Sequence, residues 1–111
     1  MELHDKQCQP LKEETSPLSE NEENEYLQKL TDWEIDRKDI HKIKKQYEFD
    51  DFDKSMEFVN KVAGIAKQED HHPDICIQYN QVDVQISTHK INGLHENDFI
   101  VAAKIDNINS F

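Results

Sequence analysis

Residues 75–89, ICIQYNQVDVQISTH, carry the clearest secondary-structure signal in the chain. Apolar and polar side chains alternate over 75–79 and again over 82–88, which is the pattern of a strand with one buried face. Only Asn80 and Gln81 separate the two runs. A loop of two residues can join antiparallel neighbours, so the stretch predicts a β-hairpin.

A turn at 80–81 sets which residues of the two strands face each other. Ile77 then lies opposite Val84, so that apolar side chains meet on the face that the sheet buries. Continued past the strand ends, the same register places His72 opposite His89. Directly opposed residues have Cβ atoms about 4.5–5.5 Å apart, so the two imidazoles are expected to be neighbours.

The residues that precede this hairpin predict two helices and a second hairpin. Ser19 followed by Glu22 has the pattern of a capping box, and a short apolar stripe follows it, so we expect a helix over about 19–30. Side chains of different character alternate with a period of two and predict a hairpin over about 32–49. Apolar residues then recur at helical spacing and predict a helix over about 52–68.

The residues that follow predict a last helix over about 96–108, after a loop in which Gly93 can take a positive φ. The order helix, two strands, helix, two strands, helix predicts an α+β fold. The simplest arrangement is a two-layer sandwich, a four-stranded antiparallel sheet with three helices on one face. The other face stays partly polar and one edge strand stays open, which a second copy of the chain can cover.

The chain of 111 residues is long enough for one compact domain, which we expect to span 18–111. Residues 1–17 contain Pro10 and Pro17 and show no apolar periodicity. We therefore expect them to form a flexible acidic N-terminal arm.

Composition and charge exclude several classes of function. The formal net charge is −11 at pH 7, so we expect no direct nucleic-acid partner and no membrane partner. The chain has no apolar run long enough to span a bilayer, and its first residues lack a secretion signal, which predicts a cytoplasmic protein. Cys8 and Cys76 do not suggest a disulfide framework and are expected to be reduced thiols.

The open end of the predicted hairpin gathers His71, His72 and His89, with Asp70 adjoining. Imidazole titrates near neutral pH, so several of them around one pocket suit a reaction that needs both an acid and a base. The same residues could instead be a polar connector in water, or could bind a metal ion. Adjacent histidines on a strand point to opposite faces, and no H-E-x-x-H or C-x-x-C motif is present, which disfavours a metal.

A set of short motifs resembles the signature of the pterin-4a-carbinolamine dehydratase family, whose members are also known as dimerisation cofactors of a homeodomain transcription factor. The motifs are His71-His72-Pro73, Tyr79-Asn80, Ser87-Thr88-His89, Gly93-Leu94 and Asp98. The resemblance covers about 18–109, and it departs from the common pattern at Lys67, Ile75 and His95. It implies the same α+β sandwich that the element order predicts.

The resemblance implies a hydro-lyase, a 4a-hydroxytetrahydrobiopterin dehydratase. Such an enzyme converts 4a-hydroxytetrahydropterin to quinonoid dihydropterin and water by histidine acid/base catalysis, in tetrahydropterin recycling. Pterin is then the substrate, and neither a cofactor nor a metal is implied. Members form homodimers and often homotetramers, and an aromatic amino acid hydroxylase is the expected functional partner. The alternative is a non-catalytic interaction or coactivator-type protein on the same fold.

The resemblance also implies roles for individual residues. His71 and His89 would be the acid/base pair, and His72 would bind and orient the pterin. Asp98 would hold a histidine tautomer, or would simply favour the dipole of the last helix. The residues implied to bind substrate are Asp70, His71, His72, Ser87, Thr88, His89 and Lys90.

Overall fold

The structure is a computed structural model that describes residues 2–108. This part of the chain forms three α-helices, four strands and two short 3-10 helices. In chain order they are η1 (Leu3–Asp5), α1 (Glu20–Leu27), β1 (Glu34–Asp36), β2 (Lys42–Glu48), α2 (Phe52–Glu69), β3 (Asp74–Gln78), β4 (Gln81–Ile86), η2 (His89–Ile91) and α3 (Glu96–Asp106).

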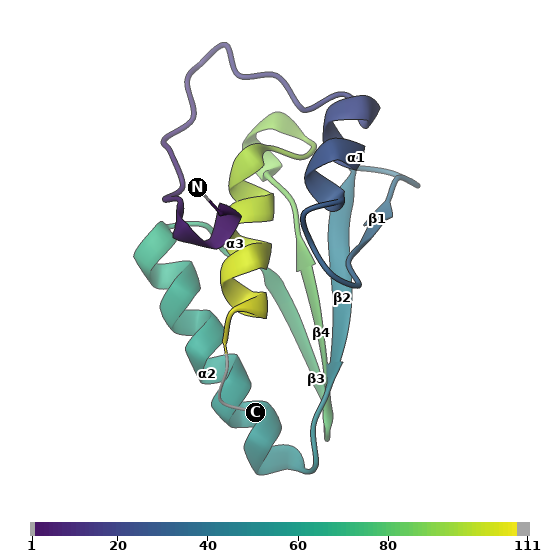
Figure 1. Cartoon of the computed structure of the whole chain (residues 1–111), viewed down its shortest axis with the longest axis vertical. Helices are drawn as coiled ribbons and strands as arrows, with labels where there is room; N and C mark the ends of the chain where they lie inside the picture. Colours follow the sequence, from purple (N-terminus) through teal and green to yellow (C-terminus); the bar gives the residue numbers. More distant parts are fainter. Residues whose placement is uncertain (1, 109–111) are drawn as a thin grey trace.

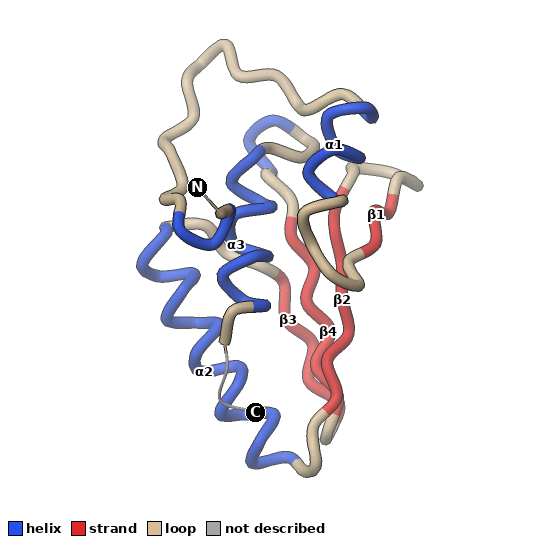
Figure 2. The backbone as a smooth tube through the Cα atoms, viewed as in Figure 1, coloured by secondary structure: helices blue, strands red, loops and turns tan. Residues whose placement is uncertain are grey.

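The strands form one antiparallel sheet in the order β1-β2-β4-β3. Helices α2 and α3 run along one face of this sheet, and α1 packs against α3 (Figure 1). Figure 2 shows the two layers, with the helices on one side and the strands on the other. The predicted α+β two-layer sandwich is confirmed.

The core lies between the two layers and is built on β4. Val82, Val84 and Ile86 are at most 1% exposed on the face toward the helices, while the polar residues between them face the other way. Val62 of α2 and Phe99 of α3, both 0% exposed, belong to the same core cluster. Burial of this apolar surface is the main force that holds helices and sheet together.

The register of the β3–β4 hairpin differs from the predicted one by two residues. Ile77 pairs with Val82 and Ile75 with Val84, so the two-residue loop is 79–80 and not 80–81. Tyr79 takes a left-handed φ of 51° and is 65% exposed. A shift of two keeps the same side chains on the buried face. The register therefore no longer places His72 opposite His89.

Side-chain caps mark the starts of α1 and α2. The Glu22 N–H donates to Ser19 Oγ at 3.2 Å, and the Ser19 N–H donates to Glu22 Oε1 at 2.9 Å, which confirms the capping box. The Asp51 carboxylate accepts the Lys54 N–H at 2.9 Å and caps α2. Helix α1 is shorter than predicted. Around Leu27 the backbone hydrogen bonds begin to join residues three apart, as in a 3-10 turn, and the α-helix ends there.

The N-terminal arm, which the sequence predicts to be flexible, packs against the helix layer in the structure. Leu3 of η1 is 6% exposed and belongs to the core cluster. Lys104 of α3 donates to the carbonyl of His4 at 3.0 Å, and Lys6 pairs with Glu96 at 2.7 Å. An extended segment held by single contacts has no periodicity, so its composition could not reveal this packing.

The loop before α3 also differs from the expectation. The positive φ in this loop belongs to Asn92, at 52°, and not to Gly93. Gly93 instead allows a close approach of the arm, because a Cβ at this position would lie 2.8 Å from Pro17 Cβ. The Leu18 N–H donates to the carbonyl of Leu94 at 2.9 Å and fixes the arm beside the loop.

Asp106 at the end of α3 joins the helix layer to the sheet. Its carboxylate accepts hydrogen bonds from Trp33 Nε1 at 2.8 Å, Lys45 Nζ at 2.8 Å and the Tyr47 hydroxyl at 2.6 Å. Burial raises the pKa of Tyr47 above its usual value, and the Asp106 carboxylate raises it further.

The raised pKa of Tyr47 predicts a loss of stability at alkaline pH. The unfolded chain releases the phenolic proton near pH 10, whereas the folded protein retains it, so the free energy of unfolding falls as the pH rises above about 10. Tyr47→Phe has no such proton and is expected to flatten this decline. Denaturant unfolding between about pH 9 and pH 11 measures the slope, and an equally steep decline in the variant would contradict the prediction.

The edge strand β3 carries exposed apolar side chains, since Ile77 is 36% exposed and Tyr79 follows it in the loop. The expected homodimer or homotetramer stays a prediction.

No helix within residues 2–108 combines the length and the apolar character that crossing a membrane requires.

Candidate active site

A cavity of about 630 Å³ lies where the end of α2, the end of β4 and the start of α3 come together beside the N-terminal arm. Its lining residues are Cys8, Gln9, Pro10, Leu11, Glu69, Asp70, His71, His72, Ser87, Thr88, His89, Lys90 and Asn97. Every residue expected at the site lines this cavity except Asp98, which is buried and bonded to two of the lining residues. The three histidines thus share one cavity although they are not strand partners.

The end of α2 delivers the first two histidines to the cavity. Asp70 closes the helix in a left-handed conformation, with a φ of 52°, and the chain turns sharply there. The His71 N–H donates back to the carbonyl of Ala66 at 3.2 Å, which fixes the turn. His71 is consequently directed inward, with a side chain only 14% exposed, while His72 stays exposed.

His71 is held by a buried carboxylate. His71 Nε2 lies 2.6 Å from Asp98 Oδ1, and Asp98 is 0% exposed. An ionised carboxylate only accepts hydrogen bonds. Nε2 therefore carries the ring proton and donates a hydrogen bond to Asp98. Nδ1 of His71 is then the ring nitrogen left to exchange a proton with a ligand. This geometry fixes both the tautomer and the orientation of the imidazole.

Asp98 has partners on both of its carboxylate oxygens. Besides His71, it accepts the Thr88 hydroxyl at 2.7 Å and the His95 N–H at 2.9 Å. These hydrogen bonds compensate for the burial of a charge, which would otherwise be costly. They also tie the end of α2, the end of β4 and the start of α3 to one group.

His89 reaches the cavity from the short helix η2 that follows β4. The Thr88 N–H donates to the carbonyl of Gly93 at 2.8 Å, and this bridge closes the loop that carries η2. His89 and Lys90 are exposed at the cavity rim. An exposed imidazole can exchange protons with water.

Sequence reasoning missed the contributions of Glu69, Asn97 and residues 8–11 to the lining. Glu69 lies two residues before the histidine motif, and Asn97 directly precedes Asp98, so their positions were a usable signal. Residues 8–11 carry no motif and lie far away in the chain. Burial and the nearby Glu69 raise the pKa of the Cys8 thiol to about 12, so the thiolate is scarce at neutral pH.

Two histidines outside the cavity, His41 and His95, form structural hydrogen bonds. His95 caps α3, with its Nδ1 accepting the Asn97 N–H at 3.0 Å. His41 Nδ1 lies 2.8 Å from Glu23 Oε2, and Arg37 binds the other oxygen of this buried carboxylate at 3.0 Å. Within residues 2–108, no group of three or more histidine, cysteine or acidic side chains is placed to hold a metal ion.

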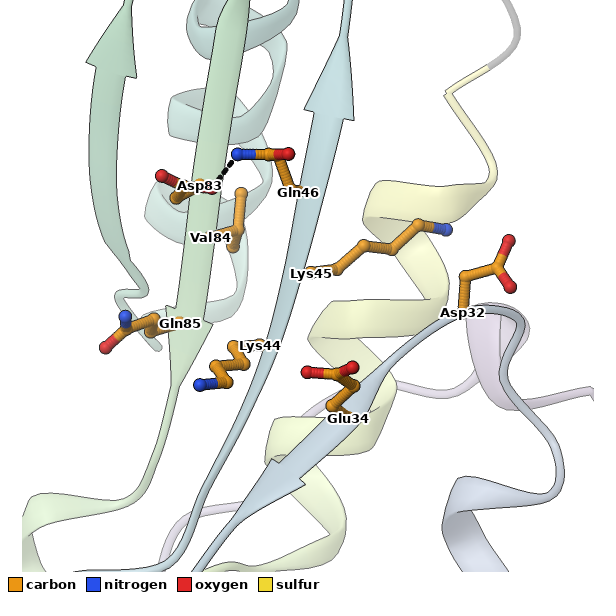
Figure 3. A pocket seen from close by; sticks show the side chains of 8 residues that line it. All are labelled: Asp32, Glu34, Lys44, Lys45, Gln46, Asp83, Val84 and Gln85. Carbon is orange, nitrogen blue, oxygen red and sulfur yellow. Dashed lines mark hydrogen bonds between the residues drawn. The ribbon is translucent and has the colours of Figure 1, made fainter.

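A second hollow, of about 440 Å³, lies over β1, β2 and β4 (Figure 3). It is lined by Asp32, Glu34, Lys44, Lys45, Gln46, Asp83, Val84 and Gln85. Lys45 donates a hydrogen bond to Asp106, and Gln46 donates one to Asp83 at 3.0 Å. No imidazole or thiol lines it, so the histidine cavity is the better candidate for acid/base chemistry.

Comparison with known proteins points to one family. A family model described as pterin 4 alpha carbinolamine dehydratase matches residues 16–108. A relative from Halorhodospira halophila is 42% identical over 106 residues, covering 96% of each chain. A relative from Rickettsia bellii is 46% identical over 104 residues, covering 94% of this chain and 91% of its own. Both are described as pterin-4-alpha-carbinolamine dehydratases, a name that is provisional for each.

Solved structures agree with this comparison. The structure described as a transcriptional coactivator/pterin dehydratase from Brucella melitensis has a TM-score of 0.80 at 35% identity, covering 86% of this chain and 100% of its own. A pterin dehydratase-like protein described as a RuBisCO assembly factor in the alpha-carboxysome has a TM-score of 0.59 at 18% identity, over 68% of this chain and 87% of its own, and shows the fold alone. The family match over most of the chain and these relatives show that the chain belongs to the pterin-4-alpha-carbinolamine dehydratase family.

Proposed function

We propose that the protein is a dehydratase that converts 4a-hydroxytetrahydropterin to quinonoid dihydropterin and water. The observation that carries the proposal is His71, held by the buried Asp98 and placed in one cavity with His72 and His89. A cavity of about 630 Å³ falls within the range of small-molecule sites and has room for a bicyclic ring. Membership of the family supports a pterin as the substrate.

The reaction needs one proton delivered and one proton removed. The C4a–O bond breaks with its electron pair on the oxygen, and an acid protonates that oxygen so that water leaves. The N5–H proton is lost to a base, and the freed electron pair forms the C4a=N5 double bond. A pair of imidazoles, one protonated and one neutral, performs both transfers, and the scheme needs no cofactor and no metal.

The surroundings of the two histidines favour a division of labour. His71 is the base at N5, because the Asp98 carboxylate stabilises the positive charge that His71 gains. His89 is the acid at the departing hydroxyl, because its exposed ring is readily protonated again from water. The cavity is also lined by Asp70, His72, Ser87 and Lys90. These residues bind the polar rim of the pterin.

The proposal is tested with the purified protein and freshly generated 4a-hydroxytetrahydropterin. We expect the protein to accelerate the appearance of quinonoid dihydropterin, followed by absorbance, well above the spontaneous rate. His41→Asn is a matched control, because it replaces a histidine outside the cavity and retains a donor for Glu23. A wild-type protein that neither accelerates the reaction nor binds a reduced pterin would reject the proposal and favour a non-catalytic interaction protein.

A further inference from the structure

The N-terminal arm forms part of the cavity lining, although it lies outside the region that the family model matches. Cys8, Gln9, Pro10 and Leu11 line the cavity, while the family match begins at residue 16. The histidine motif and the loop after β4 supply most of the other lining residues. The arm therefore adds a wall to a site whose acid/base groups all come from the rest of the chain.

The arm is anchored where it passes the cavity. The side chain of Asn97, only 4% exposed, accepts the Gln9 N–H at 3.0 Å and donates to the Gln9 carbonyl at 2.8 Å. The Cys8 N–H donates to Glu69 Oε1 at 2.8 Å, and the Cys8 thiol donates to the carbonyl of Asn97 at 3.6 Å. The backbone of Cys8 and Gln9 is thus fixed directly before Pro10 and Leu11.

The chemistry of the cavity lining is complementary to a pterin. Residues of the histidine motif and of the loop after β4 supply imidazole, hydroxyl and ammonium groups, whereas Pro10 and Leu11 supply apolar side chains. A reduced pterin is polar along its edge and much less polar on its faces. The arm is the part of the lining suited to cover a face of the ring.

We propose that residues 8–11 close the pterin site, with Pro10 and Leu11 against one face of the bound ring and Asn97 as the residue that positions the arm. This inference rests on the proposed function, because it takes a reduced pterin as the ligand. It assigns the arm to substrate affinity, while proton transfer stays with the histidines. Loss of the arm contact is therefore expected to weaken binding and raise KM, with little change in kcat.

Two neighbouring residues on the arm provide the main test. Leu11→Ala removes apolar surface from the cavity, whereas Lys12→Ala changes an exposed residue outside the lining. With 7,8-dihydropterin as the probe, Leu11→Ala is expected to raise Kd about fivefold, and Lys12→Ala to leave it within about twofold. Thermal melts verify that both variants are folded. An unchanged Kd in Leu11→Ala overturns the inference.

The positioning role of Asn97 is tested by combining variants. Asn97→Ala releases the Gln9 backbone, so Leu11→Ala should have little further effect on Kd in that background. If the two substitutions instead raise Kd by factors that multiply, as independent changes do, the role of Asn97 is overturned. In turnover assays, Asn97→Ala is expected to raise KM and to leave kcat within about twofold of the wild-type value, because both acid/base histidines are untouched.

The reactivity of Cys8 gives a readout that does not depend on activity. In a Cys76→Ser protein, saturating 7,8-dihydropterin is expected to slow alkylation of Cys8 at least about fivefold, because the ring covers the lining to which this thiol belongs. Alkylation of the exposed Cys76 in a Cys8→Ser protein is the control and should not change. An unprotected Cys8 in a protein that binds and turns over pterin overturns only the arm inference. A wild-type protein that does not bind pterin overturns both proposals.

Discussion

Replacing His71 with alanine is expected to lower the turnover of 4a-hydroxytetrahydropterin by about 10²–10⁴-fold, the usual contribution of a positioned acid or base. The loss should fall on kcat, because His71 is assigned to the removal of the N5 proton. His71→Ala leaves Asp98 with its Thr88 and His95 partners, so the fold should survive. The measurement is the initial rate after correction for the spontaneous reaction.

The companion variant His89→Ala is expected to show a loss of the same order, since it removes the proposed acid. Small amines or imidazole added to either variant should restore part of the rate by filling the vacated space. The His41→Asn protein, which lacks a histidine elsewhere, should keep the wild-type rate. Full activity of His71→Ala or His89→Ala would refute the assignment of these residues as the acid/base pair.

Asp98→Ala is the second substitution with a large expected effect, because one change affects both stability and chemistry. The imidazole of His71, the hydroxyl of Thr88 and the backbone N–H of His95 all lose their acceptor. A buried donor left without its acceptor costs about 1–3 kcal/mol, so the loss of these three hydrogen bonds should lower the free energy of unfolding by about 3–5 kcal/mol. Chemical denaturation with the wild type as reference measures the loss.

The catalytic part of this prediction is separated from the structural part by Asp98→Asn. The amide keeps an oxygen acceptor and similar volume, so most of the stability should return. Turnover should nevertheless remain about 10–100-fold below wild type, since a neutral amide no longer stabilises the charge that His71 gains. Recovery of stability together with full turnover would show that Asp98 is only a structural group.

The order of elements was predictable because it depends on local patterns. The capping box at Ser19 and the alternation over 82–86 mark α1 and β4 directly, and the structure has both elements. The hairpin register was not predictable in the same way. Turns at 79–80 and at 80–81 bury the same residues, and only the left-handed conformation of Tyr79 distinguishes them. A tyrosine is an unusual residue for that conformation, so the sequence pointed to the wrong turn.

The histidine cavity was predictable only in part. The motif at 71–72 and the residues at 87–90 do line one cavity, but the strand register that was expected to join His72 to His89 is wrong. Asp98 bonds His71 and Thr88 across the chain, a contact that no spacing in the sequence reveals. The packing of the arm was missed for the same reason, because a few contacts between distant residues hold it in place.

The contact between the arm and α3 has a consequence for how the protein folds. The bonds between Gln9 and Asn97 join residues 88 positions apart. Closing so long a chain segment costs entropy before any contact compensates for it, so such a contact forms late. During refolding, the helices and the sheet are therefore expected to regain their circular dichroism before the protein regains its affinity for pterin. With the arm closing the site as proposed, ligand binding is therefore expected to be the last property to recover.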